Sequence, residues 1–192
     1  MNRIWLRSAA GLDFVSPTRY LIALRDFEIE LALSDTPPKI KALRTNSLKP
    51  AREQRQAALF CYGMSKRLGQ EVFFAAQEDQ DYDFVAKWVI GEEIHFAQVQ
   101  LKEVVPEKNN PQASIEEIIA KLAKYTDSEG LTVAIHLNHQ GRFEPSLLKV
   151  PELKIGSLWV FGSAVPDQSR WNIWGNFTED DPYGSQFSYP EA

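Results

Sequence analysis

The stretch from Asp81 to Lys102 constrains the fold of this chain more than any other. It contains two runs rich in β-branched and aromatic residues, DFVAKWVI and IHFAQVQLK, with Gly91-Glu92 between them. This pattern is typical of a β-hairpin, because glycine suits a tight turn and alternating side chains suit a half-buried strand. A loop of two or four residues centred on Gly91-Glu92 predicts that Asp83 lies opposite Gln100 and that Asp81 lies opposite Lys102.

Alternation along the two strands divides the hairpin side chains between two faces. One face is apolar and is predicted to pack on the core: Phe84, Ala86, Trp88, Ala97, Val99 and Leu101. The other face gathers polar side chains at one end: Asp81, Asp83, Gln98, Gln100 and Lys102. Directly opposed residues have Cβ atoms about 4.5–5.5 Å apart, so oxygens of Asp83 and Gln100 can surround one small cation. Two interpretations are open: a divalent-cation site of the kind used in phosphodiester hydrolysis, or the solvated face of an amphipathic hairpin.

The rest of the chain is predicted to alternate between helices and strands. Ser16-Pro17 favours the start of an N-terminal helix, although residues 27–33 also fit a strand. A capping box at Ser114 and Glu117 predicts a helix over residues 114–125. The other predicted elements are a basic connector (36–50), a helix (51–68), strands (70–77, 131–138, 157–164 and 170–177), an irregular segment (143–156) and a loose acidic tail (178–192).

The order of these elements predicts the fold class. From residue 51 onward it is helix, three strands, helix and strand, which is typical of an α/β fold with a mixed sheet flanked by helices. Residues 1–50 are expected to form an extension packed on this core, and residues 51–192 the main domain. The 192 residues suffice for one such domain, and no apolar run approaches the ~20 residues of a membrane span. Because Cys61 is the only cysteine, no internal disulfide is expected and a reducing cytoplasm is the default location.

Charge is divided unequally along the chain. The net charge is −5, but residues 1–70 contain 12 basic and 6 acidic residues, whereas residues 71–192 contain 9 basic and 20 acidic ones. Most of the basic residues that precede the hairpin lie between residues 36 and 70, and the candidates for phosphate contact are Lys39, Lys41, Arg44, Lys49, Arg52 and Arg55. This segment suits either a nucleic-acid backbone or a surface that docks on the acidic half of the same chain.

With these elements in order, the sequence resembles the PD-(D/E)xK nuclease superfamily, whose restriction-endonuclease-like fold has an α-β-β-β-α-β core. The resemblance covers roughly residues 51–138. The superfamily's aspartate matches Asp83, its (D/E)xK triplet matches Gln100-Leu101-Lys102, and the acid that many members carry on the first helix matches Glu53. The resemblance implies that Asp83, Gln100 and Glu53 bind Mg²⁺ or Mn²⁺. It also implies that Lys102 positions the attacking water and stabilises the anion that forms.

Two residues depart from the superfamily pattern. Tyr82 stands before Asp83 where proline is common, and Gln100 stands where most members have an acid. A QxK triplet occurs both in active branches of the superfamily and in branches that have lost catalysis. Because an amide binds Mg²⁺ less tightly than a carboxylate, Asp81 or Glu71 is a candidate source of the missing charge.

The resemblance therefore predicts a metal-dependent nuclease whose partner is nucleic acid, with DNA as the first expectation and a homodimer as a compatible assembly. The alternative is a non-catalytic module, such as an immunity or regulatory protein, that binds another protein through a similar α/β scaffold. His136 and His139 are expected on opposite faces of a strand, which disfavours a shared metal ion. The tryptophans Trp159, Trp171 and Trp174 suit the core better than base stacking. No nucleotide-binding, serine-hydrolase or zinc-ribbon motif is present.

Overall fold

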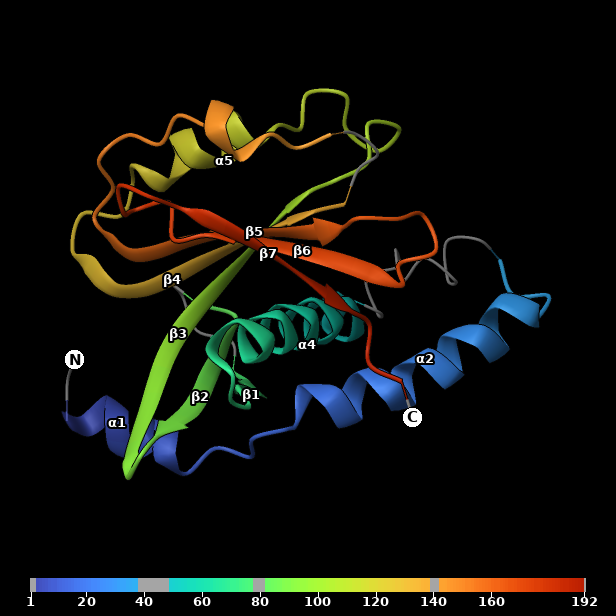
Figure 1. The fold of residues 1–192 in the computed structure, drawn as a ribbon, viewed down its shortest axis with the longest axis horizontal. Helices are drawn as coiled ribbons and strands as arrows, with labels where there is room; N and C mark the ends of the chain where they lie inside the picture. The colour runs from blue at the N-terminus through green and yellow to red at the C-terminus, as the bar shows by residue number, and fades with distance from the viewer. Residues whose placement is uncertain (1–2, 38–48, 78–81, 139–141, 192) are drawn as a thin grey trace.

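The computed structural model describes residues 3–37, 49–77, 82–138 and 142–191. These residues form an α/β fold built on a curled seven-stranded mixed sheet in which the strands lie side by side in sequence order (Figure 1). The strands are β1 (Phe73–Ala76), β2 (Phe84–Ile90), β3 (Glu93–Val104), β4 (Ser128–Leu137), β5 (Ile155–Ser163), β6 (Arg170–Gly175) and β7 (Tyr183–Ser188). In the described part of the chain, no helix combines the length and the apolar character needed to cross a bilayer.

Strand direction changes across the sheet. The strands β1, β2 and β3 pair antiparallel, β4 lies parallel to β3, and β5 lies parallel to β4. The last two strands, β6 and β7, return to antiparallel pairing. The crossover from β3 to β4 contains helix α5 (Ile115–Leu122), as a parallel pair requires a long connection. From α4 (Lys49–Leu68) to β4, the observed order is helix, three antiparallel strands, helix and parallel strand.

The predicted hairpin and its register are confirmed. Val85 pairs with Gln98, Lys87 with Phe96, and Val89 with Ile94. The turn is Gly91-Glu92, and Gly91 has a φ of 60°, which a type II′ turn requires at its first central position. The loop therefore has two residues, and the side chains divide between two faces as the alternation predicted. The face with the polar residues also carries Val85, Phe96 and Val104, which pack in a second core.

Helix α4 covers one face of the sheet (Figure 1). Its residues from Gln56 to Gly63 are buried, and they pack against the apolar hairpin face that includes Phe84, Val99 and Leu101. Burial of such side chains contributes about 1.5–3 kcal/mol each, so this layer fixes α4 over the carboxyl-terminal half of β3. Cys61 lies within this core and is fully buried.

The opposite face is covered by α5 and by α1 (Arg3–Ala10). Ile115, Ile119 and Leu122 of α5 pack with Val104 of β3 and with β4. The predicted cap is confirmed, because the Ser114 hydroxyl accepts a hydrogen bond from the Glu117 amide at 3.1 Å. The described residues between β4 and β5 are irregular apart from one short 3₁₀ turn, η2 (Pro145–Leu147).

The N-terminal extension is packed on the sheet and on α4. Residues Pro17–Leu33 form helix α2, with Ser16 as its N-cap, so the strand alternative for residues 27–33 is wrong. Leu21 is fully buried in the core beneath α4. Val15 also forms two backbone hydrogen bonds with Phe74 of β1, at 2.8 and 3.1 Å, which attach the segment before α2 to the edge of the sheet.

The prediction of a loose tail is wrong. Residues 183–188 form β7, which pairs along its whole length with β6. Phe187 is buried against Tyr62 of α4, and Tyr189 is buried with its hydroxyl donating to the Leu21 carbonyl at 2.9 Å. Two aromatic side chains therefore fix a segment whose composition is otherwise polar.

Candidate active site

Asp83 directly precedes β2 and lies beside β3. Its backbone amide donates to the Val99 carbonyl at 2.9 Å, just beyond the last ladder pair between the two strands. Its carboxylate oxygen Oδ2 accepts a hydrogen bond from the backbone amide of Leu101 at 2.6 Å. The side chain thus continues the hydrogen bonding of β3 beyond the start of β2, which satisfies a backbone donor at the end of the ladder.

Gln100 meets the same carboxylate oxygen. Its Nε2 donates to Asp83 Oδ2 at 2.5 Å, which confirms that the hairpin brings these two side chains together. Its Oε1 accepts a hydrogen bond from the Tyr125 hydroxyl at 3.3 Å. The orientation of the amide follows from this chemistry, because only its nitrogen can donate to a carboxylate. The amide oxygen therefore faces Tyr125 and not Asp83.

Tyr125 was not predicted to belong to the site. It follows α5, is 6% exposed, and has its ring beneath the ammonium group of Lys124 at 4.8 Å. Tyr125 is the last residue of the helix predicted over residues 114–125, and no sequence signal connected its hydroxyl to the hairpin. Gln100 and Tyr125 are 25 residues apart in the sequence, and the packing of α5 on the sheet brings their side chains into contact.

Lys102 lies two residues beyond Gln100 and on the same face of β3. Burial lowers the pKa of its ammonium group, the nearby carboxylate of Asp83 opposes that shift, and Lys124 adds to it. The ammonium group of Lys102 therefore interacts electrostatically with both Asp83 and Lys124. Asp83, Gln100 and Lys102 form one polar cluster, as the hairpin register predicted.

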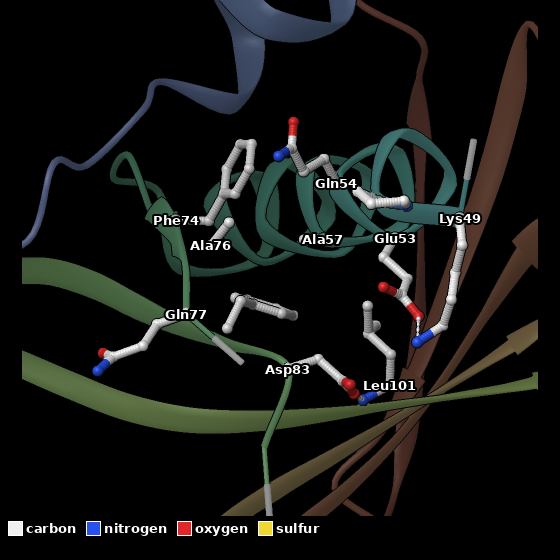
Figure 2. Close-up of a pocket in the computed structure, with 11 residues that line it drawn as sticks. Lys49, Glu53, Gln54, Ala57, Phe74, Ala76, Gln77, Asp83 and Leu101 are labelled. Atoms are coloured by element: carbon white, nitrogen blue, oxygen red, sulfur yellow. Dashed lines mark hydrogen bonds and ion pairs between the residues drawn. The ribbon is translucent and has the colours of Figure 1, made fainter. Parts of the chain in front are cut away.

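Glu53 approaches Asp83 from the α4 side of the sheet. Both residues line a cavity of about 290 Å³ between the start of α4 and the strands β1, β2 and β3. Figure 2 shows Glu53 extending from α4 toward the strands, while the Asp83 carboxylate lies next to Leu101. The Glu53 carboxylate is 3.2 Å from the ammonium group of Lys49, one helical turn earlier. Glu53 and Asp83 thus share a cavity, whereas Gln100 and Lys102 belong to the face covered by α5.

The donor set suits a hard divalent cation. Asp83, Glu53 and the Gln100 amide offer oxygen atoms, which Mg²⁺ and Mn²⁺ prefer. Among the residues that the structure describes, no group of three or more acids, histidines or cysteines is placed to hold an ion. Mg²⁺, however, is usually bound through one or two carboxylates together with substrate phosphate oxygens and water, so two carboxylates on one cavity fit it.

Three of the residues predicted to contact nucleic acid are described by the structure, and each of them has a partner within the protein. Lys49 pairs with Glu53, and the Arg52 guanidinium lies 3.8 Å from Glu103. Arg55 is the most enclosed of them: it pairs with Glu28 at 2.7 Å and lies over the ring of the buried Trp171. The other three predicted contacts, Lys39, Lys41 and Arg44, lie outside the described residues.

Two acids were candidates for extra charge near Gln100. Glu71 accepts a hydrogen bond from the Ser16 hydroxyl at 2.5 Å and lines a different groove beside α2, so it does not face the Asp83 cavity. Asp81 lies outside the described residues. Among the described residues, the polar cluster therefore contains the Asp83 carboxylate, and Glu53 adds a second carboxylate from the α4-side cavity.

The remaining aromatic and histidine candidates are mostly structural. His136 is buried between the rings of Phe161 and Trp171 and lies 3.2 Å from the Gln56 amide. His139 lies outside the described residues. Trp171 is 1% exposed, which confirms it as a core residue, while Trp159 and Trp174 are partly buried at the edges of the two cores.

No protein-family model, curated protein or solved structure matches the chain. Function must therefore be inferred from the chemistry of the polar cluster and from the order of the elements that build it.

Proposed function

We propose that the chain is a divalent-metal-dependent nuclease with a restriction-endonuclease-like core, which hydrolyses phosphodiester bonds in nucleic acid. The observation that carries this inference is the contact between Asp83 at the start of β2 and Gln100 on β3, with Lys102 two residues further along the same strand. An acid, an amide and a lysine thus lie close together, although Asp83 precedes β2 and the other two belong to β3.

The order and direction of the elements give independent support. From Lys49 to Leu137 the chain forms a helix, three antiparallel strands, a helix and a strand parallel to the third. This is the element order that the resemblance to the PD-(D/E)xK superfamily implies. Asp83 and Gln100 occupy the positions in it where that superfamily places an aspartate and the first residue of its triplet.

The residues have distinct roles in this function. Asp83 would hold Mg²⁺ or Mn²⁺ with the Gln100 amide oxygen on the α5 side of the sheet, and Glu53 would support the ion from the cavity that it shares with Asp83 on the α4 side. The ion would supply charge for the phosphate and an activated water. Lys102 supplies a positive charge beside Asp83. Because burial lowers its pKa, Nζ gives up its proton more readily than an exposed lysine does, which suits it to orient water and exchange a proton with it.

The first test is cleavage of single- and double-stranded DNA and RNA in Mg²⁺, comparing the wild type with Asp83→Ala. Loss of a metal ligand is expected to reduce cleavage by more than the about 10–100-fold that is typical of outer-shell changes. Asp180→Ala removes an exposed aspartate from the loop before β7 and is the matched control. Equal cleavage by the wild type and Asp83→Ala would reject the site.

The second candidate function, a non-catalytic module that binds another protein, is favoured by a different observation. The polar groups of the site satisfy one another: Gln100 Nε2 bonds to Asp83, Gln100 Oε1 bonds to Tyr125, and Glu53 pairs with Lys49. Such a cluster is stable without an added ion. Absence of both Mg²⁺ binding and nucleic-acid binding would favour this second function.

A further inference from the structure

We propose that Tyr125 is a positioning residue that allows the Gln100 amide to rotate between Asp83 and a bound divalent cation. This inference rests on the proposed function and explains how a glutamine at position 100 can act as a metal ligand. It concerns two residues whose contacts are visible: Gln100, which bonds to Asp83 through Nε2, and Tyr125, whose hydroxyl bonds to Gln100 Oε1.

The observed amide orientation excludes a cation between Asp83 and Gln100. The nitrogen of Gln100 lies 2.5 Å from the Asp83 carboxylate, in the place where a shared ion would need an oxygen. A cation bound by both side chains therefore requires the amide to turn over, so that Oε1 faces Asp83 and Nε2 faces Tyr125. The amide nitrogen and the cation compete for the same carboxylate oxygen.

A tyrosine hydroxyl can serve both orientations. It donates one hydrogen bond and accepts others, so it donates to Oε1 in the observed state and accepts from Nε2 after the amide has turned. The hydroxyl is held in place because Tyr125 is 6% exposed and its amide donates to the Leu122 carbonyl at 3.0 Å. Neither Asp83 nor Gln100 needs to move its backbone for this rotation.

Removing the hydroxyl should affect the two orientations unequally. In the observed state, Tyr125→Phe leaves the Gln100 oxygen without this donor. In the turned state, it leaves an amide N–H against the phenylalanine ring. Orphaned N–H groups are tolerated less well than under-satisfied carbonyl oxygens, so the cation-bound orientation is the one that loses more. Tyr125→Phe should therefore weaken Mg²⁺ binding by about 3- to 10-fold.

The experiment combines calorimetric Mg²⁺ titration with NMR of the Gln100 side-chain NH₂ group in the full chain. The resonance is assigned by its absence in Gln100→Glu. In the wild type we expect Mg²⁺ to shift this resonance pair as the amide leaves Asp83. Tyr125→Phe should move the same pair before Mg²⁺ is added. Tyr189→Phe is the matched control, because it also removes a buried hydroxyl bonded to a carbonyl but lies beneath α2.

A double-mutant cycle separates positioning from general structural damage. A carboxylate at position 100 has no amide to turn, so Tyr125→Phe should change Mg²⁺ affinity less in the Gln100→Glu background than in the wild type. An equal loss in both backgrounds, or Mg²⁺ binding that leaves the Gln100 resonances unmoved, would overturn the role of Tyr125 while leaving the proposed function intact. Failure of the wild type to bind Mg²⁺, both alone and with nucleic acid present, would overturn both.

Discussion

Lys102 shows how the site affects stability at the level of a single residue. Burial lowers the pKa of its ammonium group from 10.5, and Asp83 offsets only part of that shift. Between the lowered pKa and 10.5, the unfolded chain binds more protons at this lysine than the folded protein does. The free energy of unfolding therefore rises with pH through this window, and the full cost of burying the charge is present at neutral pH.

Replacing the lysine by methionine should remove that cost. Lys102→Met is expected to raise the free energy of unfolding at neutral pH by less than about 1 kcal/mol, because solvent screens a half-buried charge. The gain should shrink as pH approaches 10.5, because the folded wild-type lysine loses its proton at a lower pH than the unfolded chain does. Urea denaturation at neutral pH and near pH 10 measures both values. Lys108→Met, at an exposed loop position, should show neither the gain nor its pH dependence.

The contact of Asp83 with Gln100 was predictable, whereas the orientation of the Gln100 amide was not. The contact follows from the local alternation and the turn at Gly91, because a two-residue loop fixes the register of the whole hairpin. The orientation depends on Tyr125, whose position is set by the packing of α5 against β3 and not by its own sequence context. Short-range patterns determine register, but they cannot specify which residue of a distant element completes a hydrogen bond.

The same distinction appears at the level of elements. The hairpin, α4 and α5 were predicted because each has a strong periodic pattern or a cap. Strand β7 was missed because its segment is acidic and contains few apolar residues. It forms because β6 offers an edge and because Phe187 fills space beside Gly63, where an added Cβ would lie 2.7 Å from the phenylalanine ring. β7 is therefore a strand mainly because of its contacts with β6 and α4, and not because of a pattern in its own sequence.

Phe187 should therefore be critical to the stability of the C-terminal part of the sheet. Phe187→Ala is expected to lower the free energy of unfolding by about 3–5 kcal/mol, because it removes buried contacts with Tyr62 and leaves a cavity. Gln186→Ala, at the exposed neighbouring position on β7, should cost less than about 1 kcal/mol. Chemical denaturation of the three proteins gives the comparison. Equal stability of the two variants would show that β7 contributes little to the fold.

At the level of the whole molecule, the two helical layers make the N-terminal extension and the sheet into one packed unit. Leu21 of α2 lies in the core with α4, and Ala9 of α1 lies in the core on the α5 side. Glu28 of α2 also pairs with Arg55 of α4. An extension packed on a core was predicted, but these contacts enclose Arg55, which was expected to contact phosphates. Within this basic segment, Arg55 is therefore held in an internal ion pair, whereas Lys49 lies nearer the Asp83 cavity.

Charge distribution limits how a polyanion can approach this molecule. Residues 71–192 contain 20 acidic and 9 basic residues and should repel nucleic acid, whereas Lys49 and Arg52 lie at the start of α4 and Lys49 lines the Asp83 cavity. The positive end of the α4 dipole points the same way. The Lys49 ammonium group is half exposed and its pair with Glu53 is worth only about 0–1 kcal/mol, so Lys49 can turn to a phosphate. Arg52 is more enclosed and must leave Glu103 to make such a contact. Approach of nucleic acid at this end of α4 is therefore the favoured geometry.

This geometry predicts the salt dependence of binding. In metal-free buffer, the affinity of the wild type for nucleic acid should fall with salt, with a logarithmic slope of about −0.9 for each phosphate contacted in duplex DNA. Substituting both Lys49 and Arg52 by alanine should reduce the size of that slope by about 2. Fluorescence anisotropy at several salt concentrations measures it, with Lys149→Ala/Lys154→Ala as the control on the acidic half. An unchanged slope would place the phosphate contacts elsewhere, and no binding even at low salt would favour the protein-binding module over the nuclease.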